Sequence, residues 1–187
     1  MKHSEIKDHI IKTASDLFYH KGYNLTGINE IISEAGIAKA TLYNHFKSKE
    51  DICLAYLQYK NRAFLTKINE VCYSKKEGTD QVLAVFDFLE LFFKDKDFNG
   101  CWCINTISEL PKENQKIRLE IQLQKRNFIA FLTDLVETNL PNQDKAQQEM
   151  MARQIYLLYE GAVSESHLHQ SDWPITSARE LCNTIIN

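Results

Sequence analysis

Apolar residues recur along the chain at the spacing of an amphipathic helix, and short polar or glycine-containing breaks separate the segments. Residues 5–21 place five apolar residues on one stripe: Ile6, Ile10, Ala14, Leu17 and Phe18. Gly22 follows where a C-terminal cap belongs, so this segment predicts a first helix. Thr26 is expected as the N-cap of a second, short helix that ends at Gly36, and the stretch from Ala38 to Phe46 predicts a third.

The rest of the chain predicts further helices of the same kind. Residues 48–51 have the Ser-x-x-acid form of a capping box and open a long segment that extends to about Val71. Turn signals divide the remaining residues into helices near 79–94, 101–110, 112–139, 144–168 and 175–186. With only three Pro and six Gly in 187 residues, and few β-branched clusters, the sequence predicts an all-α fold of about nine helices.

Charge is distributed unevenly along the chain. The formal net charge of −3 by itself argues against nucleic acid as a partner. Residues 1–60, however, carry eight Lys and seven acidic residues, net +1, together with four of the six His, whereas residues 61–187 are net −4. The balance therefore favours DNA binding at the N-terminal end only, and weakly.

No segment has the pattern of an export signal or a membrane anchor. The N-terminus lacks the apolar run of a signal peptide, and no later stretch approaches the roughly 18 apolar residues of a membrane span. We therefore expect a cytoplasmic protein without membrane contact, whose five cysteines are free thiols rather than a disulfide framework. We expect no cofactor. His167 and His169 stand two apart with no third ligand, so we expect no metal site.

Two short helices joined by a glycine-containing turn are the form of a helix-turn-helix, whose second helix enters the major groove of DNA. Here the second helix is 38–46, with Leu42 and Phe46 facing inward. Its other sides carry a cation, small residues, and hydroxyl, amide and imidazole groups: Lys39, Ala40, Thr41, Tyr43, Asn44 and His45. Such groups can bond phosphates or base edges. The pattern alone fits a DNA-reading helix and the solvated face of a three-helix bundle about equally well.

Three specific motifs lie between Leu17 and Glu50. They are the L-F-x-x-x-G-Y-x-x-T stretch, the A-G-I-A-K-A-T-L-Y-x-H-F element and the S-K-E that follows it. Together they resemble the N-terminal domain of the TetR family of repressors. The resemblance implies a helix-turn-helix DNA-binding domain at 1–50, followed by a helical ligand-binding and dimerisation domain at 51–187.

The same resemblance implies roles for individual residues. Tyr43 and Lys49 would contact phosphates, and Thr26 would combine helix capping with a contact to the DNA backbone. The residues that would approach phosphates or bases are Lys39, Ala40, Asn44 and His45. Two positions depart from the family pattern. Ala38 replaces a capping hydroxyl residue, at a cost on the order of 1 kcal/mol of helix-end stability, and Asn29 replaces an acidic residue.

The resemblance also implies partners and a mode of control. We expect a homodimer on a palindromic operator in double-stranded DNA, because symmetry doubles the few bases that one short helix reads. We expect a small-molecule effector to release the operator by shifting the helix that begins after Ser48. A regulator that does not repress, such as an activator, is the alternative within this class.

The middle of the chain has the composition of a buried core with aromatic residues. Residues 82–93 are apolar on nearly every side, which suits a helix buried in a bundle. The resemblance implies that the middle helices enclose a pocket for a small, mostly apolar ligand. The candidate lining residues are Phe86, Leu89, Trp102, Phe128, Tyr156 and Tyr159. The alternative is that these side chains only fill the core.

The last two long helices are expected, from the resemblance, to pair with those of a second copy in an intersubunit four-helix bundle. The candidate interface residues are Tyr159, Gly161, Ala162 and Val163. Gly161 and Ala162 are small enough to allow close approach of two helices. The alternative is that these residues serve folding within one subunit.

Cys101 and Cys103 are candidate sensors of electrophiles or oxidants. They follow Gly100 at the expected start of a helix, where the helix N-terminus favours the thiolate, and Cys101 is the better placed. Some members that resemble the chain here use cysteine chemistry as their signal. No Lys or Arg lies within four residues, however, and buried inert cysteine is common.

A cysteine-dependent enzyme is the rival class, but no nucleophile motif supports it, so we expect a protein that is not an enzyme.

Overall fold

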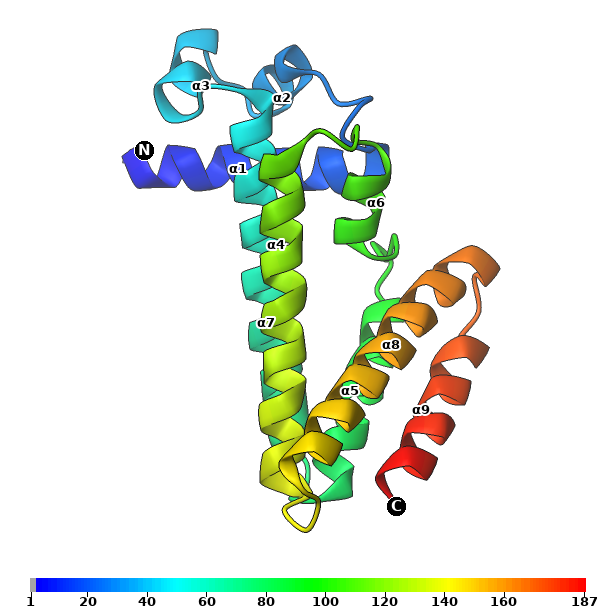
Figure 1. Ribbon diagram of the computed structural model, residues 1–187. Coiled ribbons are helices and arrows are strands. Elements are labelled where there is room, and N and C mark those ends of the chain that lie inside the picture. The colour runs from blue at the N-terminus through cyan, green and yellow to red at the C-terminus, as the bar shows by residue number, and fades with distance from the viewer. Residues whose placement is uncertain (1–2) are drawn as a thin grey trace. The chain divides into compact units, whose positions relative to one another are not determined.

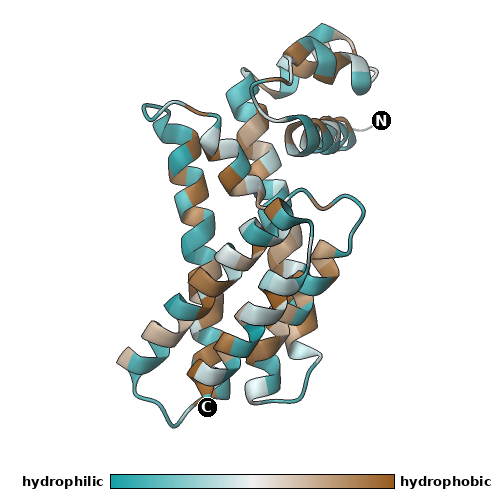
Figure 2. Cartoon of the chain, turned by 90° about the vertical axis from the view of Figure 1, so that its right-hand side faces the viewer, coloured by the Kyte–Doolittle hydropathy of each residue, from teal (hydrophilic) through white to brown (hydrophobic). Residues whose placement is uncertain are grey.

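The computed structural model describes residues 3–187, which form nine helices and no strand (Figure 1). The helices are α1 (His3–Lys21), α2 (Ile28–Glu34), α3 (Lys39–His45), α4 (Lys49–Tyr73), α5 (Thr79–Phe93), α6 (Trp102–Ser108), α7 (Gln115–Asn139), α8 (Lys145–His169) and α9 (Trp173–Ile186). The expected all-α fold of about nine helices is confirmed. Figure 2 shows hydrophobic and hydrophilic residues sharing most helices, as the amphipathic pattern of the sequence predicts.

The chain divides into two compact units. Unit 1 contains the described residues up to Ala63 together with Trp102–Leu123, and unit 2 contains Phe64–Cys101 and Gln124–Asn187. The long helices α4 and α7 each begin in unit 1 and end in unit 2. This division follows packing, whereas the expected boundary at residue 50 is a division by role and stays a prediction.

Unit 1 is built on a small apolar core beneath the helix-turn-helix. Its fully buried side chains include Ile10, Ile31, Leu42, Ile52 and Tyr56. α1 ends as predicted at Gly22, whose N–H donates to the carbonyl of Phe18 at 3.1 Å. α4 begins as predicted after Ser48, whose Oγ accepts a hydrogen bond from the N–H of Asp51 at 3.1 Å.

In unit 2, α5 packs against both α8 and α9, which lie side by side (Figure 1). The expectation that residues 82–93 form a buried helix holds for most of α5, because its residues 81–86, 88 and 89 are buried. An aromatic cluster continues this core. Its members, joined by ring centroid separations of 5.0–6.5 Å, are Phe64, Phe86, Phe88, Phe128 and Tyr159.

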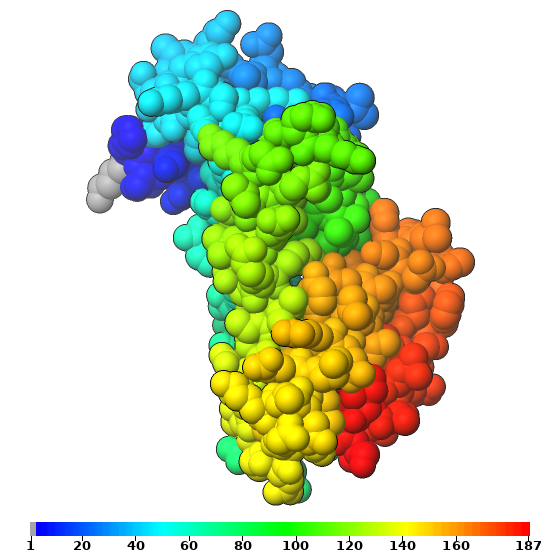
Figure 3. All heavy atoms as spheres, viewed as in Figure 1, coloured from blue at the N-terminus to red at the C-terminus, as the bar shows by residue number. Residues whose placement is uncertain are grey.

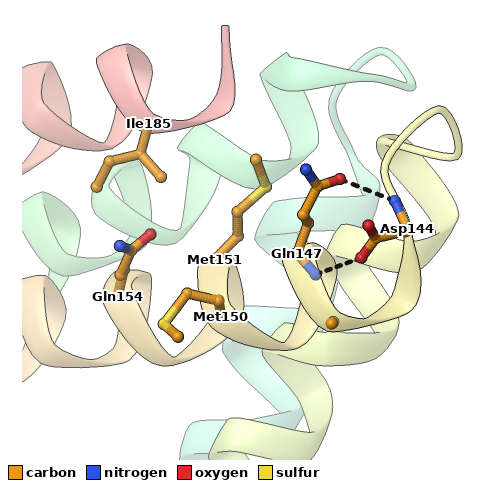
Figure 4. A pocket seen from close by; sticks show the side chains of 7 residues that line it. Asp144, Gln147, Met150, Met151, Gln154 and Ile185 are labelled. Carbon is orange, nitrogen blue, oxygen red and sulfur yellow. Dashed lines mark hydrogen bonds between the residues drawn. The ribbon is translucent and has the colours of Figure 1, made fainter.

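α8 starts with a complete capping box. The Asp144 side chain accepts a hydrogen bond from the Gln147 N–H at 2.9 Å, and the Gln147 side chain accepts one from the Asp144 N–H at 3.0 Å (Figure 4). This reciprocal pair satisfies donors that the first helical turn leaves without partners, and so fixes the start of α8. Within the described part of the chain, no helix is both long and apolar enough to cross a membrane.

Candidate nucleic-acid interface

α3 presents a polar face to solvent while two apolar residues anchor it. Leu42 and Phe46 are buried, as predicted. Lys39, Ala40, Tyr43 and Asn44 are exposed, and Thr41 and His45 are half-buried. Since buried anchors fix the orientation of a short helix, the exposed side chains project from a defined surface. The structure therefore brings together on one helix the six residues that the sequence singled out there.

The ends of α3 are held by different means. At its start, Ala38 has extended backbone and makes no capping hydrogen bond through its side chain, in agreement with its departure from the family pattern. At its end, the N–H of Phe46 donates to the carbonyl of Leu42 at 2.9 Å, and the Lys7 ammonium lies 5.7 Å from the centroid of the Phe46 ring. α1 thus helps to hold the C-terminal end of the recognition helix.

His45 lies against the imidazole ring of His3, with 4.1 Å between the ring centroids. Burial lowers the pKa of His45, and His3 and Lys7 lower it further. Its Nδ1 is buried without a hydrogen-bond partner among the described residues. The predicted contact of His45 with DNA would therefore use Nε2, and that contact stays a prediction.

Two expected phosphate ligands differ in their surroundings. The Tyr43 side chain is exposed and open to a partner. The Lys49 ammonium lies 4.3 Å from the centroid of the Tyr23 ring, and burial lowers its pKa. This cation–π contact holds Lys49 near the start of α4. Its contact with a phosphate stays a prediction.

The prediction that Thr26 caps α2 is wrong. The N-cap is Gly27, whose backbone is extended, and its N–H donates to Glu30 Oε2 at 3.4 Å. The Thr26 side chain is fully buried, and its Oγ1 donates to the carbonyl of Gly22 at 2.7 Å. The hydroxyl thus bonds a carbonyl at the end of α1 instead of an N–H at the start of α2, and the Thr26 side chain has no exposed surface to offer to DNA.

A carboxylate that no local pattern signals ties α6 to the turn between α1 and α2. Glu109, just past the end of α6, accepts hydrogen bonds from the N–H of Tyr23 at 3.2 Å and of Asn24 at 2.7 Å. Asn24 Nδ2 in turn donates to the carbonyl of Glu109 at 2.8 Å. All of these residues belong to unit 1. The partners are 85 or more residues apart in the chain, which is why sequence reasoning does not reveal them.

The candidate ligand residues do not all lie in one unit. Five of them belong to unit 2, where Phe86, Leu89, Phe128 and Tyr159 are buried in the core and Tyr156 is half-buried. Trp102 belongs to unit 1, where the Lys60 ammonium lies 5.8 Å from the centroid of its ring. The aromatic side chains fill the core of unit 2, and the ligand pocket stays a prediction.

Cys101 has a cationic neighbour that the sequence did not reveal. Lys125 Nζ on α7 lies 3.3 Å from Cys101 Sγ and 2.6 Å from Glu160 Oε1 on α8. Burial raises the pKa of Glu160 to about 7, the Cys101 thiol contributes to the rise, and Lys125 opposes it. α6 begins only at Trp102, so the expected helix start at residue 101 is off by one residue. Cys103 is almost wholly buried.

The residues predicted for the dimer interface differ in exposure, and the interface itself stays a prediction. Tyr159 and Val163 are buried in the core of their own chain, whereas Gly161 is exposed. Ala162 is buried as well, and takes part only in the lining of a surface groove between α8 and α9. Its lining also includes Leu157, Gly161, Trp173, Pro174, Ala178 and Leu181.

Large apolar side chains that the sequence pattern does not single out are also exposed on α8 and α9, the helices coloured orange and red in Figure 3. Leu157 is 68% exposed, Trp173 52% and Leu181 55%. Near the start of α8, a second hollow of about 390 Å³ is lined by Met150, Met151 and Ile185 among others (Figure 4). The apolar surface therefore follows α8 and α9 along much of their length.

A helix-turn-helix with an exposed polar second helix defines a DNA-binding regulatory protein. Residues 10–56 match the family model described as bacterial regulatory proteins of the tetR family. The chain is 26% identical to the HTH-type transcriptional repressor NemR of Escherichia coli K12, over 99% of this chain and 96% of that protein. The N-terminal domain therefore belongs to the tetR family of bacterial regulatory proteins, and the similarity to a transcriptional repressor extends along nearly the whole chain.

Solved structures agree with this assignment at the level of the fold. A TetR-family regulator from Streptomyces coelicolor, SCO4454, is 24% identical with a TM-score of 0.87, over 98% of this chain and 95% of that one. The reduced form of E. coli NemR is 23% identical with a TM-score of 0.87, over 98% of this chain and 97% of that one. Since the family consists of transcriptional regulators, the expectation that the chain is not an enzyme is confirmed.

Proposed function

We propose that this regulator is a repressor that binds a palindromic operator as a homodimer and releases it when a small molecule binds. The observation that carries the proposal is the surface of α3, where Lys39, Tyr43 and Asn44 are exposed over the buried anchors Leu42 and Phe46. Similarity along nearly the whole chain to a repressor supports repression rather than activation.

On this proposal the residues of α3 divide by role. Tyr43, with Lys49 at the start of α4, contacts phosphates and so positions the helix without specifying sequence. Lys39, Ala40, Thr41, Asn44 and His45 lie on the helix that follows the major groove. Among them the amide of Asn44 is suited to an adenine edge, with which it can make two hydrogen bonds.

The apolar surface of α8 and α9 supports the homodimer. Exposed leucine and tryptophan side chains that follow two adjacent helices are unfavourable in water, and a second copy would bury them against the same surface of its own. The contact would centre on Leu157, Gly161, Trp173 and Leu181, where the small Gly161 lets helices approach closely. This set replaces Tyr159 and Val163 of the sequence prediction.

The course of α4 supports control by a ligand. α4 begins directly after the recognition helix and continues into unit 2, where its residue Phe64 packs against Phe88, Phe128 and Tyr159. A small apolar molecule among these rings would displace Phe64 and with it α4. Because interfaces and packed cores switch between discrete arrangements, a small shift of α4 changes the spacing of two recognition helices in a dimer.

Operator binding by α3 variants tests the proposal. We expect Tyr43→Phe to weaken binding several-fold on all sequences, because it removes a phosphate contact. We expect Asn44→Ala to reduce the discrimination between bases at the contacted position by about 1–3 kcal/mol of binding free energy. Tyr73→Phe, an exposed tyrosine at the end of α4, is the matched control and should bind like the wild type. Fluorescence anisotropy on a set of operator variants measures both effects. If both α3 variants bind as the wild type does, α3 is not the reading helix.

A second candidate, control through the thiol of Cys101, is favoured by one observation. The Lys125 ammonium lies 3.3 Å from Cys101 Sγ, and a nearby cation favours the reactive thiolate. If the thiol is the sensor, Cys101→Ser will bind operator but keep it on treatment with peroxide, a quinone or an aldehyde. Cys103→Ser is the matched control and should release it. Wild type that keeps its operator after such treatment would exclude this candidate.

A further inference from the structure

Three reactive side chains from three elements meet in unit 2. Cys101 lies just before α6, Lys125 on α7 and Glu160 on α8. Lys125 Nζ is 3.3 Å from Cys101 Sγ and 2.6 Å from Glu160 Oε1, and Cys101 Sγ is 3.8 Å from Glu160 Oε2. A thiol, an amine and a carboxylate thus lie in mutual contact, which places two nucleophiles and one base around a single point.

The segment that carries Cys101 is held against the same helix as Glu160. Gly100 has a left-handed backbone with φ +72°, and a Cβ there would lie 3.0 Å from the His167 ring of α8. His167 Nε2 also makes a 3.1 Å hydrogen bond with Asn99 Oδ1. His167 is two turns of α8 from Glu160, on the same face. The segment that directly precedes Cys101 is therefore held against the helix that carries Glu160.

Access to this cluster is narrow. Cys101 is 8% exposed, and the side chains of Lys125 and Glu160 are each 18% exposed. This limited exposure favours a carbonyl compound of a few atoms over a bulkier reagent. Burial raises the pKa of Cys53, Cys72 and Cys182 to about 12, so those thiols stay protonated and unreactive at neutral pH.

We propose that Cys101 and Lys125 capture a small aldehyde covalently, with the carbonyl carbon ending as a bridge between Sγ and Nζ. Thiols add to carbonyl groups, and lysine amines condense with them. One carbon bonded to both atoms brings them slightly closer than their present 3.3 Å, so the bridge needs little movement. The capture itself stands on the geometry, and only its effect on DNA binding rests on the proposed control through Cys101.

The chemistry balances without an oxidant or a further reagent. In the first step the thiol sulfur bonds to the carbonyl carbon, and the thiol proton ends on the oxygen, which gives a hemithioacetal. Glu160 then takes a proton from the Lys125 ammonium. The amine nitrogen bonds to the same carbon as the carbon–oxygen bond breaks, and the hydroxyl leaves as water with the second amine proton. The product is a sulfur–carbon–nitrogen bridge.

Mass spectrometry of the purified full-length protein treated briefly with equimolar formaldehyde tests the capture. Formation of the bridge adds formaldehyde and loses water, so the intact mass rises by one carbon atom. Proteolysis should then yield a linked pair of peptides containing Cys101 and Lys125. We expect Lys125→Arg, which keeps the cation but removes the amine nucleophile, to abolish this product, and Glu160→Gln to form it several-fold more slowly. The matched control Cys103→Ser should form it as the wild type does.

Other products overturn the proposal. A mass gain confined to other lysines, or an unlinked adduct on Cys101 in the wild type, shows that the two side chains do not act together. The linked peptide of the wild type decides this even if a variant fails to fold.

Operator binding is measured separately by anisotropy. Bridged protein that keeps its operator refutes control through Cys101 but not the capture, whereas a protein that binds operator but forms no bridge refutes the capture but not the repressor.

Discussion

At the scale of single residues, Glu160 couples the stability of the fold to pH. Burial raises its pKa from an ordinary 4.5 to about 7, with the Cys101 thiol adding to the rise and Lys125 opposing it. A carboxyl group with a higher pKa in the folded state binds more protons there than in the unfolded chain between those two values. Its contribution to stability is therefore full below pH 4.5 and is lost as the pH rises through about 7.

Glu160→Gln should remove the loss of stability that accompanies rising pH. We expect the free energy of unfolding of the variant, minus that of the wild type, to increase between pH 4.5 and about 7 by up to a few kcal/mol, and then to level off. Urea denaturation across this pH range measures the difference. Glu113→Gln, at an exposed position, is the control and should give a constant difference. A constant difference for Glu160→Gln as well would contradict the raised pKa.

Sequence predicts single residues well where their role depends on near neighbours. Leu42 and Phe46 are predictable as buried because they repeat at helical spacing on one short helix. The contact of Lys125 with Cys101 is not predictable, because the two stand 24 residues apart and only the packing of α7 brings their side chains together. The prediction that Thr26 caps α2 is wrong for a different reason. Thr and Gly are both good N-caps, and the hydroxyl of Thr26 instead bonds the carbonyl of Gly22 at the end of α1.

At the scale of elements, the turn between α1 and α2 depends on a glycine and on Glu109. Gly22 has φ +95°, in the left-handed region, and a Cβ there would lie 2.6 Å from Glu109 Oε1. A side chain would thus strain the backbone and also push away the carboxylate that accepts hydrogen bonds from Tyr23 and Asn24. Gly36, in the turn between α2 and α3, has φ +61° with open space around it.

Gly22→Ala should therefore destabilise the protein more than Gly36→Ala. Both variants place an alanine in the left-handed region, which costs of order 1 kcal/mol, but only Gly22→Ala also disturbs Glu109. Chemical denaturation of the two variants beside the wild type measures the difference. Equal losses would show that Glu109 gives way freely and does not hold the turn.

Helix positions are predictable because their signals are local. Gly22 ends α1 and Ser48 caps α4 as the sequence indicates. The sequence predicts the start of α7 at residue 112, but the helix begins at Gln115, because the Asn114 side chain accepts a hydrogen bond from the N–H of Ile117 and caps it there. Pro111 suggests the earlier start, whereas the turn that it opens continues to residue 114.

At the scale of the whole molecule, association is the property that sequence specifies least. Helical periodicity marks α8 and α9 as amphipathic but does not say which apolar residues serve the core of one chain and which a partner. Tyr159 and Val163 turn inward because α5 packs against α8 and α9, and Leu157, Trp173 and Leu181 remain exposed. The burial of each side chain in the folded chain distinguishes the residues of the core from those exposed on the surface.

Leu181→Asp should weaken the dimer. A charge placed in a buried apolar contact loses its hydration without a partner, so we expect the dissociation constant to rise at least about tenfold. Leu119→Asp, at an equally exposed leucine of α7, is the matched control and should leave the dimer unchanged. Analytical ultracentrifugation at micromolar concentration compares the two. If Leu119→Asp dissociates the dimer and Leu181→Asp does not, the interface lies on α7 and not on α8 and α9.

The most direct test of the central claim is a protection experiment on the DNA that flanks the gene. A dimer whose two α3 helices read DNA should protect two half-sites related by dyad symmetry, with centres about one helical turn or a multiple of it apart. Protection should weaken with added salt only as much as a few phosphate contacts per subunit require. A monomer at micromolar concentration that protects one asymmetric half-site, or no specific protection even at low salt, would contradict the assignment of α3 as the operator-reading helix of a homodimeric repressor.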